Sequence, residues 1–104
     1  MNKEVDFVNS MEVLLSKHFD VRREVWSKCG ESRIDMVLKL KNRDIYFGIE
    51  CKLPDSKRGE KIGEYLKQAI RYTNNYFEVE KGIYKKIPIF ICPPLSYKYF
   101  ILNN

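Results

Sequence analysis

Two carboxylates and one amine stand out in this chain because each interrupts an apolar segment that favours a β-strand. Asp35 lies within residues 33–38, and Glu50 and Lys52 end the next such segment. Side chains alternate along a strand, so Glu50 and Lys52 share one face while Cys51 points to the other. A buried charge needs a partner or a task. Two carboxylates beside an ammonium group would suit a divalent metal ion next to a cation, which is the equipment for phosphodiester hydrolysis.

The residue types match what that chemistry would need. Magnesium or manganese takes hard oxygen ligands and keeps several waters, so Asp35 and Glu50 would be enough to hold the ion. The backbone carbonyl of Cys51 is a predicted third protein ligand. The ion would lower the pKa of a water, and Lys52 would orient that water or stabilise charge on the phosphate. A lone Glu-x-Lys would more often be a surface ion pair, so the motifs around it decide its interpretation.

A helix is expected from about residue 59 to 76, because apolar residues recur there at helical spacing. The predicted buried stripe of this helix consists of Ile62, Leu66, Ala69, Thr73 and Tyr76. Beside it, Gln68 and Tyr72 are four residues apart and therefore lie on one face. They form a Gln-x-x-x-Tyr motif, which in isolation is more often a helix-surface pair than a site.

These motifs together resemble a known family. In sequence order they are Asp35, Glu50, Cys51, Lys52, Gln68 and Tyr72. Following an N-terminal helix, this series resembles the PD-(D/E)xK nuclease superfamily, over roughly residues 4–92. The Gln-x-x-x-Tyr element is similar to that of RecB-type, lambda-exonuclease-type and type I restriction nuclease domains. Ile34 stands where the family name has Pro, at a position that is permissive in the superfamily.

The resemblance implies a fold, an activity and a role for each residue. The implied fold is α/β, with a restriction-endonuclease-like αβββαβ core whose mixed central sheet is flanked by helices. Residues 1–104 would form a single nuclease domain. Asp35 and Glu50 would ligate the metal ion, and Lys52 would assist catalysis. Gln68 and Tyr72 would steady the site or contact the nucleic acid.

The family often adds a glutamate from the first helix, and two candidates exist here. Apolar residues at helical spacing predict that helix at about residues 3–18. Glu4 and Glu12 both lie at the edge of its buried stripe, so periodicity does not choose between them. Glu4 is preferred, because its distance from the strand that follows is more similar to the family pattern.

The charge balance suits a polyanionic partner. The chain of 104 residues carries a net charge of +5, which favours nucleic acid as a partner and says little about the fold. Basic residues gather in or just before the second helix and are predicted to contact phosphates. They are Lys57, Arg58, Lys61, Lys67 and Arg71. A solvated helix face is the competing interpretation, and the nearby Glu60 and Glu64 favour it in part.

Length and cysteine usage exclude several classes. A chain this short has room for one modest core and no second domain. The three cysteines are far apart, without a Cys-x-x-Cys pair or a histidine cluster, so zinc is not expected. An odd cysteine count without a secretory signal fits the cytoplasm. No apolar run approaches the roughly 20 residues that a membrane span needs, so no membrane association is expected.

The remaining elements follow from local patterns. The expected order is helix 3–18, strands 21–26, 34–41 and 44–52, helix 59–76 and strand 88–92. A tight turn at residues 42–43 would make a hairpin, and the loop at 53–59 would border the site. Residues 78–86 are expected to be polar and irregular. Residues 97–102 would be an edge strand or an oligomer contact, with plain packing as the simplest role.

The function favoured by the sequence is a magnesium- or manganese-dependent deoxyribonuclease. So small a protein has little surface for reading bases, so structure-specific or weakly sequence-specific cutting is expected. An RNase or toxin-type nuclease on the same scaffold is the alternative enzyme. A non-catalytic nucleic-acid-binding module is the alternative of another class. A homodimer is expected, because small cores gain from association and paired cuts need two sites.

Overall fold

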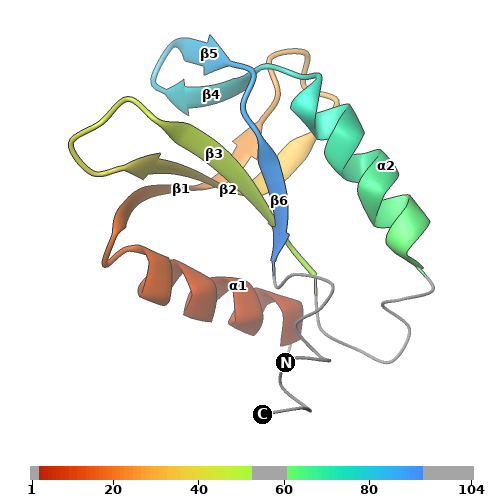
Figure 1. Ribbon diagram of the computed structural model, residues 1–104, viewed down its shortest axis with the longest axis horizontal. Coiled ribbons are helices and arrows are strands. Elements are labelled where there is room, and N and C mark those ends of the chain that lie inside the picture. Colours follow the sequence, from red (N-terminus) through yellow and green to blue (C-terminus); the bar gives the residue numbers. More distant parts are fainter. Residues whose placement is uncertain (1–2, 53–60, 93–104) are drawn as a thin grey trace.

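The protein is a mixed α/β domain in which a four-stranded sheet carries a helix on each side (Figure 1). The computed structural model describes residues 3–52 and 61–92. Its elements are α1 (Lys3–Leu15), β1 (Phe19–Trp26), β2 (Arg33–Leu40), β3 (Tyr46–Cys51), α2 (Ile62–Thr73), β4 (Phe77–Glu80), β5 (Ile83–Lys85) and β6 (Ile89–Cys92). The expected order of elements is therefore present, with one additional hairpin between α2 and β6.

The sheet is mixed, as expected. Its strand order is β1-β2-β3-β6, and β6 runs parallel to β3 while the other neighbours are antiparallel. Gly48 lies at its centre, where an added Cβ would collide with Ile34 and Ile89. The glycine therefore lets the ends of the Ile34 and Ile89 side chains pack directly against β3, and a larger residue would have to displace them. Within the described ranges, no helix is long and apolar enough to cross a membrane.

Two hydrophobic clusters cover the two faces of the sheet. Val8 of α1 packs with Met36, Leu38, Ile49 and Cys51 on one face. On the other face, Tyr72 of α2 and two residues of β4 pack with side chains of all three antiparallel strands. Both faces of β3 are thus covered, which explains why its sequence reads as a continuous apolar run. It also means that the charge on Glu50 is buried in the sheet.

The regular alternation of side chains breaks beside Asp35. Ile34 and Met36 are two residues apart, yet they belong to the clusters on opposite faces of the sheet. In the neighbouring strand, Glu24 has φ +51°, a left-handed conformation that residues other than glycine rarely adopt. In both strands, therefore, the side chains before and after this position point to opposite faces from those that regular alternation would give. Strain of this kind persists only where the surroundings hold it, and it is often found at functional sites.

Several predicted boundaries were wrong by a few residues. α1 ends at Leu15 rather than 18, because Ser16 and His18 close the last turn onto Glu12 and Leu15. β1 begins at residue 19 rather than 21, and β3 at residue 46 rather than 44. The expected two-residue turn is longer: the Leu40 N–H donates to Ile45 O, with Asn42 at φ +68°. α2 runs over residues 62–73, shorter than expected at its C-terminal end.

The prediction that residues 78–86 are irregular was wrong. They contribute to an antiparallel hairpin of β4 and β5, whose turn contains Gly82 at φ +78°. Phe77 and Val79 are buried, whereas Glu78 and Glu80 are partly exposed. This is the two-residue alternation of a half-buried strand. The hairpin closes the core on the face opposite α1, so it supports the sheet that carries the carboxylates.

The predicted buried stripe of α2 was also wrong, except at Ala69, which is partly buried. Ile62, Leu66 and Tyr76 are 42%, 49% and 48% exposed, and Thr73 is exposed as well. The helix instead turns another face toward the sheet. That face consists of Tyr65, Gln68, Ala69 and Tyr72. The Gln-x-x-x-Tyr motif therefore points inward, toward β3, and the most apolar row of α2 points away from the sheet.

Candidate active site

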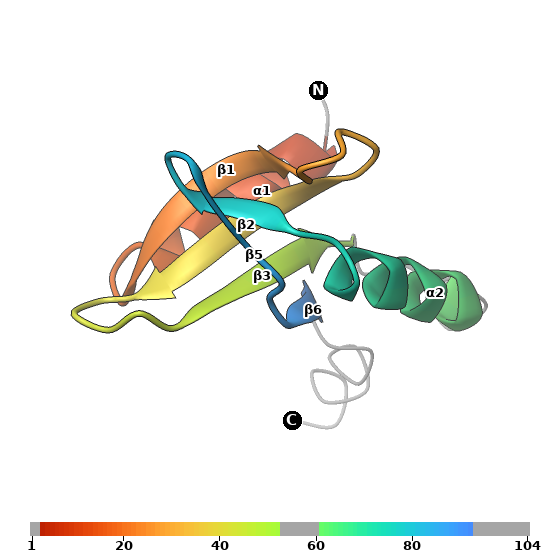
Figure 2. The same cartoon turned by 90° about the horizontal axis from the view of Figure 1, so that it is seen from above.

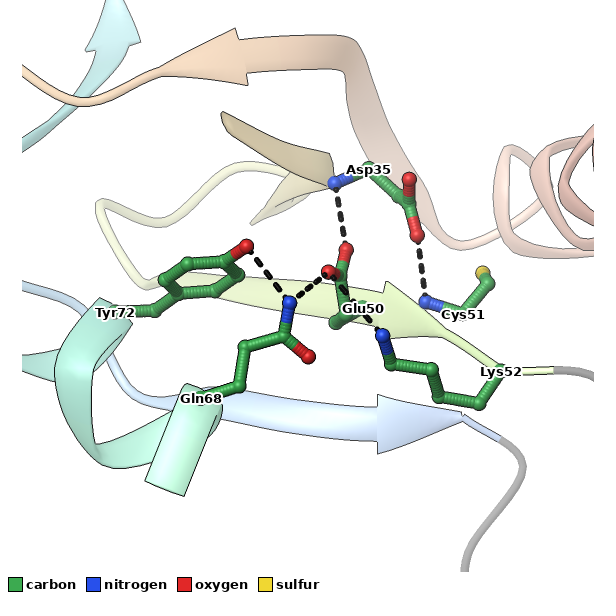
Figure 3. Close-up of polar contacts among 6 residues, drawn as sticks. All are labelled: Asp35, Glu50, Cys51, Lys52, Gln68 and Tyr72. Carbon is green, nitrogen blue, oxygen red and sulfur yellow. Dashed lines mark hydrogen bonds and ion pairs between the residues drawn. The ribbon is translucent and has the colours of Figure 1, made fainter. Parts of the chain in front are cut away.

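Asp35 and Glu50 lie where β2 and β3 separate. The paired ladder between these strands ends at Met36 and Ile49, one residue before the two carboxylates. Beyond that point the side chains take over the backbone pairing (Figure 3). The Asp35 N–H donates to Glu50 Oε1 at 3.3 Å, and the Cys51 N–H donates to Asp35 Oδ2 at 2.7 Å. Each carboxylate is thus held by the backbone of the strand that carries the other one.

Burial and proximity change the protonation of Glu50. The residue is 8% exposed, and its pKa is raised from 4.5 to about 8. Loss of hydration is the largest cause, followed by a hydrogen bond to Asp35 and repulsion from its charge, while Lys52 acts in the opposite direction. Close to neutral pH, the carboxylate pair therefore holds a proton that a bound cation would displace.

Gln68 links α2 to the carboxylates. Its Nε2 donates to Glu50 Oε2 at 3.1 Å and to the Tyr72 hydroxyl at 2.9 Å (Figure 3). Tyr72 is buried, and loss of hydration is the largest cause of its raised pKa, ahead of the charge on Glu50. The pair is therefore not a helix-surface contact. It connects the hydrophobic core under α2 to the orientation of the Glu50 carboxylate.

Lys52 lies beside the same carboxylate. Its Nζ is 3.8 Å from Glu50 Oε2 and 5.2 Å from the centre of the Tyr65 ring. Its backbone N–H donates to Cys92 O of β6 at 3.0 Å. The ammonium group is thus held between the Glu50 carboxyl group and an aromatic face at the end of β3. Tyr65 was not predicted from the sequence, although its position three residues before Gln68 puts it on the same helix face.

The two candidate glutamates of α1 have different surroundings. Glu12 Oε1 accepts a hydrogen bond from Arg23 at 2.9 Å, and Arg23 is also bound to Asn9. Glu4 instead lines a cavity of about 250 Å³ that Asp35 also lines. Glu24, with its left-handed backbone, lines this cavity too. Glu4 therefore shares a cavity with Asp35, and its role at the carboxylate pair stays a prediction.

The donors at the site are oxygen atoms. Across residues 3–52 and 61–92, no group of three or more His, Cys, Asp or Glu side chains is arranged to hold a metal ion. Asp35 and Glu50 are the carboxylates that meet, and a hard cation that keeps most of its waters needs no more than one or two. The donor set therefore fits magnesium or manganese and does not fit zinc. A ligand role for the Cys51 carbonyl stays a prediction.

The basic residues of the second helix divide into two groups. Lys61, Lys67 and Arg71 are exposed on or next to α2. Lys67 and Arg71 are four residues apart and adjoin Gln68 on its helix, so they flank the site. Lys57 and Arg58 lie outside the described residues, as do residues 97–102, for which an edge strand or an oligomer contact was expected.

Comparison of the chain with protein-family models, with curated proteins and with solved structures returned no match in any of the three.

Proposed function

We propose that this protein is a divalent-metal-dependent nuclease that hydrolyses DNA phosphodiester bonds on a restriction-endonuclease-like scaffold. The observation that carries the proposal is the single hydrogen-bonded cluster that joins Asp35, Glu50 and Gln68, with Lys52 at its edge. These residues come from two strands and a helix, and the resemblance to the PD-(D/E)xK superfamily names the same ones. Ordinary ion pairing would not require a buried glutamate with two neutral donors and a raised pKa.

Magnesium or manganese would be held by Asp35 and Glu50, and Glu4, which lines one cavity with Asp35, is the further candidate from α1. A bound ion would supply a Lewis acid that lowers the pKa of a water and offsets phosphate charge. Holding it requires Glu50 to lose its proton, and the ion compensates for the burial that raises the pKa of this residue. The Cys51 N–H keeps Asp35 in place while this happens.

The other residues would position and stabilise the reacting groups. Lys52, held against Tyr65, would stabilise the negative charge that develops on the phosphate, as a preorganised cation does without reorganising. Gln68 would fix Glu50 Oε2, and Tyr72 would fix Gln68. Lys61, Lys67 and Arg71 would contact the phosphates of the strand beyond the site. Such contacts are indifferent to base identity, which fits weakly sequence-specific cutting.

The test is a cleavage assay on supercoiled, linear, branched and single-stranded DNA and on RNA, with and without magnesium or manganese. We expect DNA to be cut only when the divalent ion is present. Asp35→Asn should abolish cutting, and the matched replacement Asp44→Asn, at an exposed position in the β2–β3 turn, should not. Cleavage by Asp35→Asn at the wild-type rate would contradict the site. Cutting of RNA alone would favour the ribonuclease alternative, and binding without cutting would favour the non-catalytic module.

A further inference from the structure

Trp26 is the only tryptophan in the chain, and it lies on the surface. It ends β1 and remains 54% exposed. In the antiparallel ladder it pairs with Arg33, the first residue of β2. The guanidinium carbon of Arg33 lies 5.6 Å from the centre of the indole ring. The protein thus presents a large aromatic surface beside a fixed positive charge.

This pair adjoins the carboxylates. Arg33 and Asp35 are two residues apart on β2, and both line the cavity of about 250 Å³ between α1 and the sheet. Arg33 therefore contacts the Trp26 ring on one side and the cavity that reaches Asp35 on the other. A strand whose phosphate lay near Asp35 would bring its neighbouring nucleotide to this pair.

Two further pairs of the same kind lie beyond the end of β1. Lys28 lies over the Tyr84 ring at 5.6 Å, and Lys86 over the Tyr76 ring at 5.3 Å. The Lys28 N–H donates to the Tyr76 carbonyl at 2.7 Å, which ties the β1–β2 turn to the C-terminal end of α2. This turn, the end of α2 and the β4–β5 hairpin meet at one end of the molecule (Figure 1). Tyr76 and Tyr84 are 48% and 38% exposed.

Aromatic rings that alternate with cations suit one class of ligand. Single-stranded nucleic acids bind by stacking their bases on such rings while cations follow the backbone. Bases in a duplex are stacked on one another and must leave the stack before a side chain can cover their faces. An apolar protein partner would not require a cation at every ring. The net charge of +5 also favours a polyanion.

We propose that Trp26 and Arg33 form a stacking platform for an unpaired base next to the Asp35–Glu50 site, so that the substrate is DNA with a single-stranded segment. Trp26 stacks on the base, and Arg33 binds the phosphate between that base and the site. Lys28 with Tyr84 and Lys86 with Tyr76 guide the strand onward. This inference rests on the proposed nuclease function, since it names the form of DNA that the site would receive.

Intrinsic fluorescence tests the platform directly, because all tryptophan emission comes from Trp26. The full chain is titrated in EDTA with a thymidine oligonucleotide and with a blunt duplex of equal length, and binding is followed independently by the anisotropy of a dye-labelled strand. We expect the single strand to quench the emission in parallel with binding. Duplex binding should change the emission much less.

Variants distinguish the stacking of a base on Trp26 from general electrostatic attraction of DNA to the protein. Trp26→Ala should weaken single-strand binding about five- to a hundred-fold, the range measured for the loss of one stacked base, and should leave duplex affinity nearly unchanged. Trp26→Phe should retain most of the affinity. Arg33→Ala should weaken binding and reduce its salt dependence. Ile70→Ala, a control at a 63% exposed position on α2, should do neither. Melting curves by circular dichroism check that each variant is folded.

Two results would overturn the platform: unchanged emission when anisotropy shows saturation by the single strand, or equal loss of single-strand and duplex affinity in Trp26→Ala. Cleavage by the wild type with magnesium is measured separately. If cleavage occurs while either result holds, the platform is wrong and the nuclease proposal stands. If quenching and the selective loss are seen without any cleavage, the platform stands and the nuclease proposal fails.

Discussion

Glu50 is buried, accepts two hydrogen bonds and lies next to a charged side chain. The Asp35 N–H and Gln68 Nε2 each donate to one of its oxygens, and Lys52 is within 3.8 Å. These contacts would suit an ionised carboxylate, yet burial and the Asp35 carboxyl raise its pKa to about 8. The site is therefore built for a charge that the metal-free protein holds only at alkaline pH. A divalent cation is the simplest partner that would change this.

The raised pKa predicts how stability changes with pH in the absence of divalent ions. Below pH 4.5, Glu50 is protonated in both the folded and the unfolded state; between there and about pH 8, only the folded state holds the proton. Stability should therefore fall as pH rises across this window, by about 1.4 kcal/mol per pH unit where the difference is complete, and level off above it. Urea unfolding at a series of pH values in EDTA measures this decline.

Glu50→Gln serves as the control for that experiment, because it keeps the shape and cannot ionise. Its stability should lack most of the decline, so it should be more stable than the wild type at pH 9. In the wild type, magnesium should stabilise the protein more at pH 8 than at pH 6, since the ion competes with the proton. An identical decline in Glu50→Gln and wild type would show that another group is responsible.

Lys52 is expected to act on the rate and not on metal affinity. Lys52→Ala should lower the cleavage rate by about 10² to 10³-fold, the scale of losing one charge-stabilising group. Removal of a cation cannot weaken the binding of another cation electrostatically, so calorimetric titration with magnesium at pH 9 should show no loss of affinity. Much weaker magnesium binding by Lys52→Ala would instead indicate that Lys52 holds the carboxylates in place.

At the scale of elements, α2 shows why part of the site was predictable and part was not. Gln68 and Tyr72 were identified from their spacing together with the resemblance to the PD-(D/E)xK superfamily, and they do reach Glu50 through a chain of hydrogen bonds. The orientation of the helix was wrong because hydrophobicity was used to choose its buried face. Ile62 and Leu66 are exposed, whereas Tyr65 lies over Lys52. Contacts with the site override the apolar pattern here, so local sequence gives the wrong face.

The strands also divide into those that the sequence predicted and those that it did not. β2 and β3 were recognised because apolar and β-branched residues fill them, and their charges were informative for that reason. The β4–β5 hairpin was missed, although Phe77 and Val79 alternate with glutamates, because four residues are too few to stand out. The left-handed conformation of Glu24 has no sequence signal at all. Glu24 is the residue between Arg23 and Val25 that has no partner in the β1–β2 ladder, and only the folded sheet reveals this.

The link between α2 and β3 predicts an effect on turnover. Gln68→Ala removes a donor to Glu50 and one to Tyr72, so the carboxylate loses its orientation. The basic residues that we propose contact DNA are unchanged. We expect kcat to fall more than ten-fold, with DNA affinity within about two-fold of wild type. Tyr72→Phe keeps the packing and removes only an acceptor from Gln68, so its effect should be smaller. Ile70→Ala is the matched control on α2. Equal losses in all three variants would mean that helix stability alone is involved.

At the scale of the whole molecule, the carboxylate cluster, the basic residues of α2 and the exposed Trp26 lie on different parts of the fold. The carboxylate cluster lies where β2 and β3 part. α2 lies beside this end of β3 (Figure 2) and contacts the cluster through Gln68. Lys67 and Arg71 extend along α2 in one direction, and the aromatic surface around Trp26 lies at the end of β1. The homodimer expected from the small size of the chain stays a prediction, and sedimentation equilibrium would measure the mass.

This division predicts the salt dependence of DNA binding. For every duplex phosphate that the protein no longer neutralises, the slope of log affinity against log salt should become shallower by about 0.9. Replacing Lys61, Lys67 and Arg71 together by Ala should therefore reduce the steepness of this slope by about two to three and weaken binding to all duplex sequences alike.

A triple replacement of Lys3, Lys17 and Lys41, which are exposed and lie outside α2, removes the same charge and is the control. It should lower affinity only slightly at 0.1 M salt, because charges more than about 10 Å from the DNA are largely screened at this salt concentration. Equal slopes for the two triple variants would mean that net charge, and not the α2 surface, attracts the DNA.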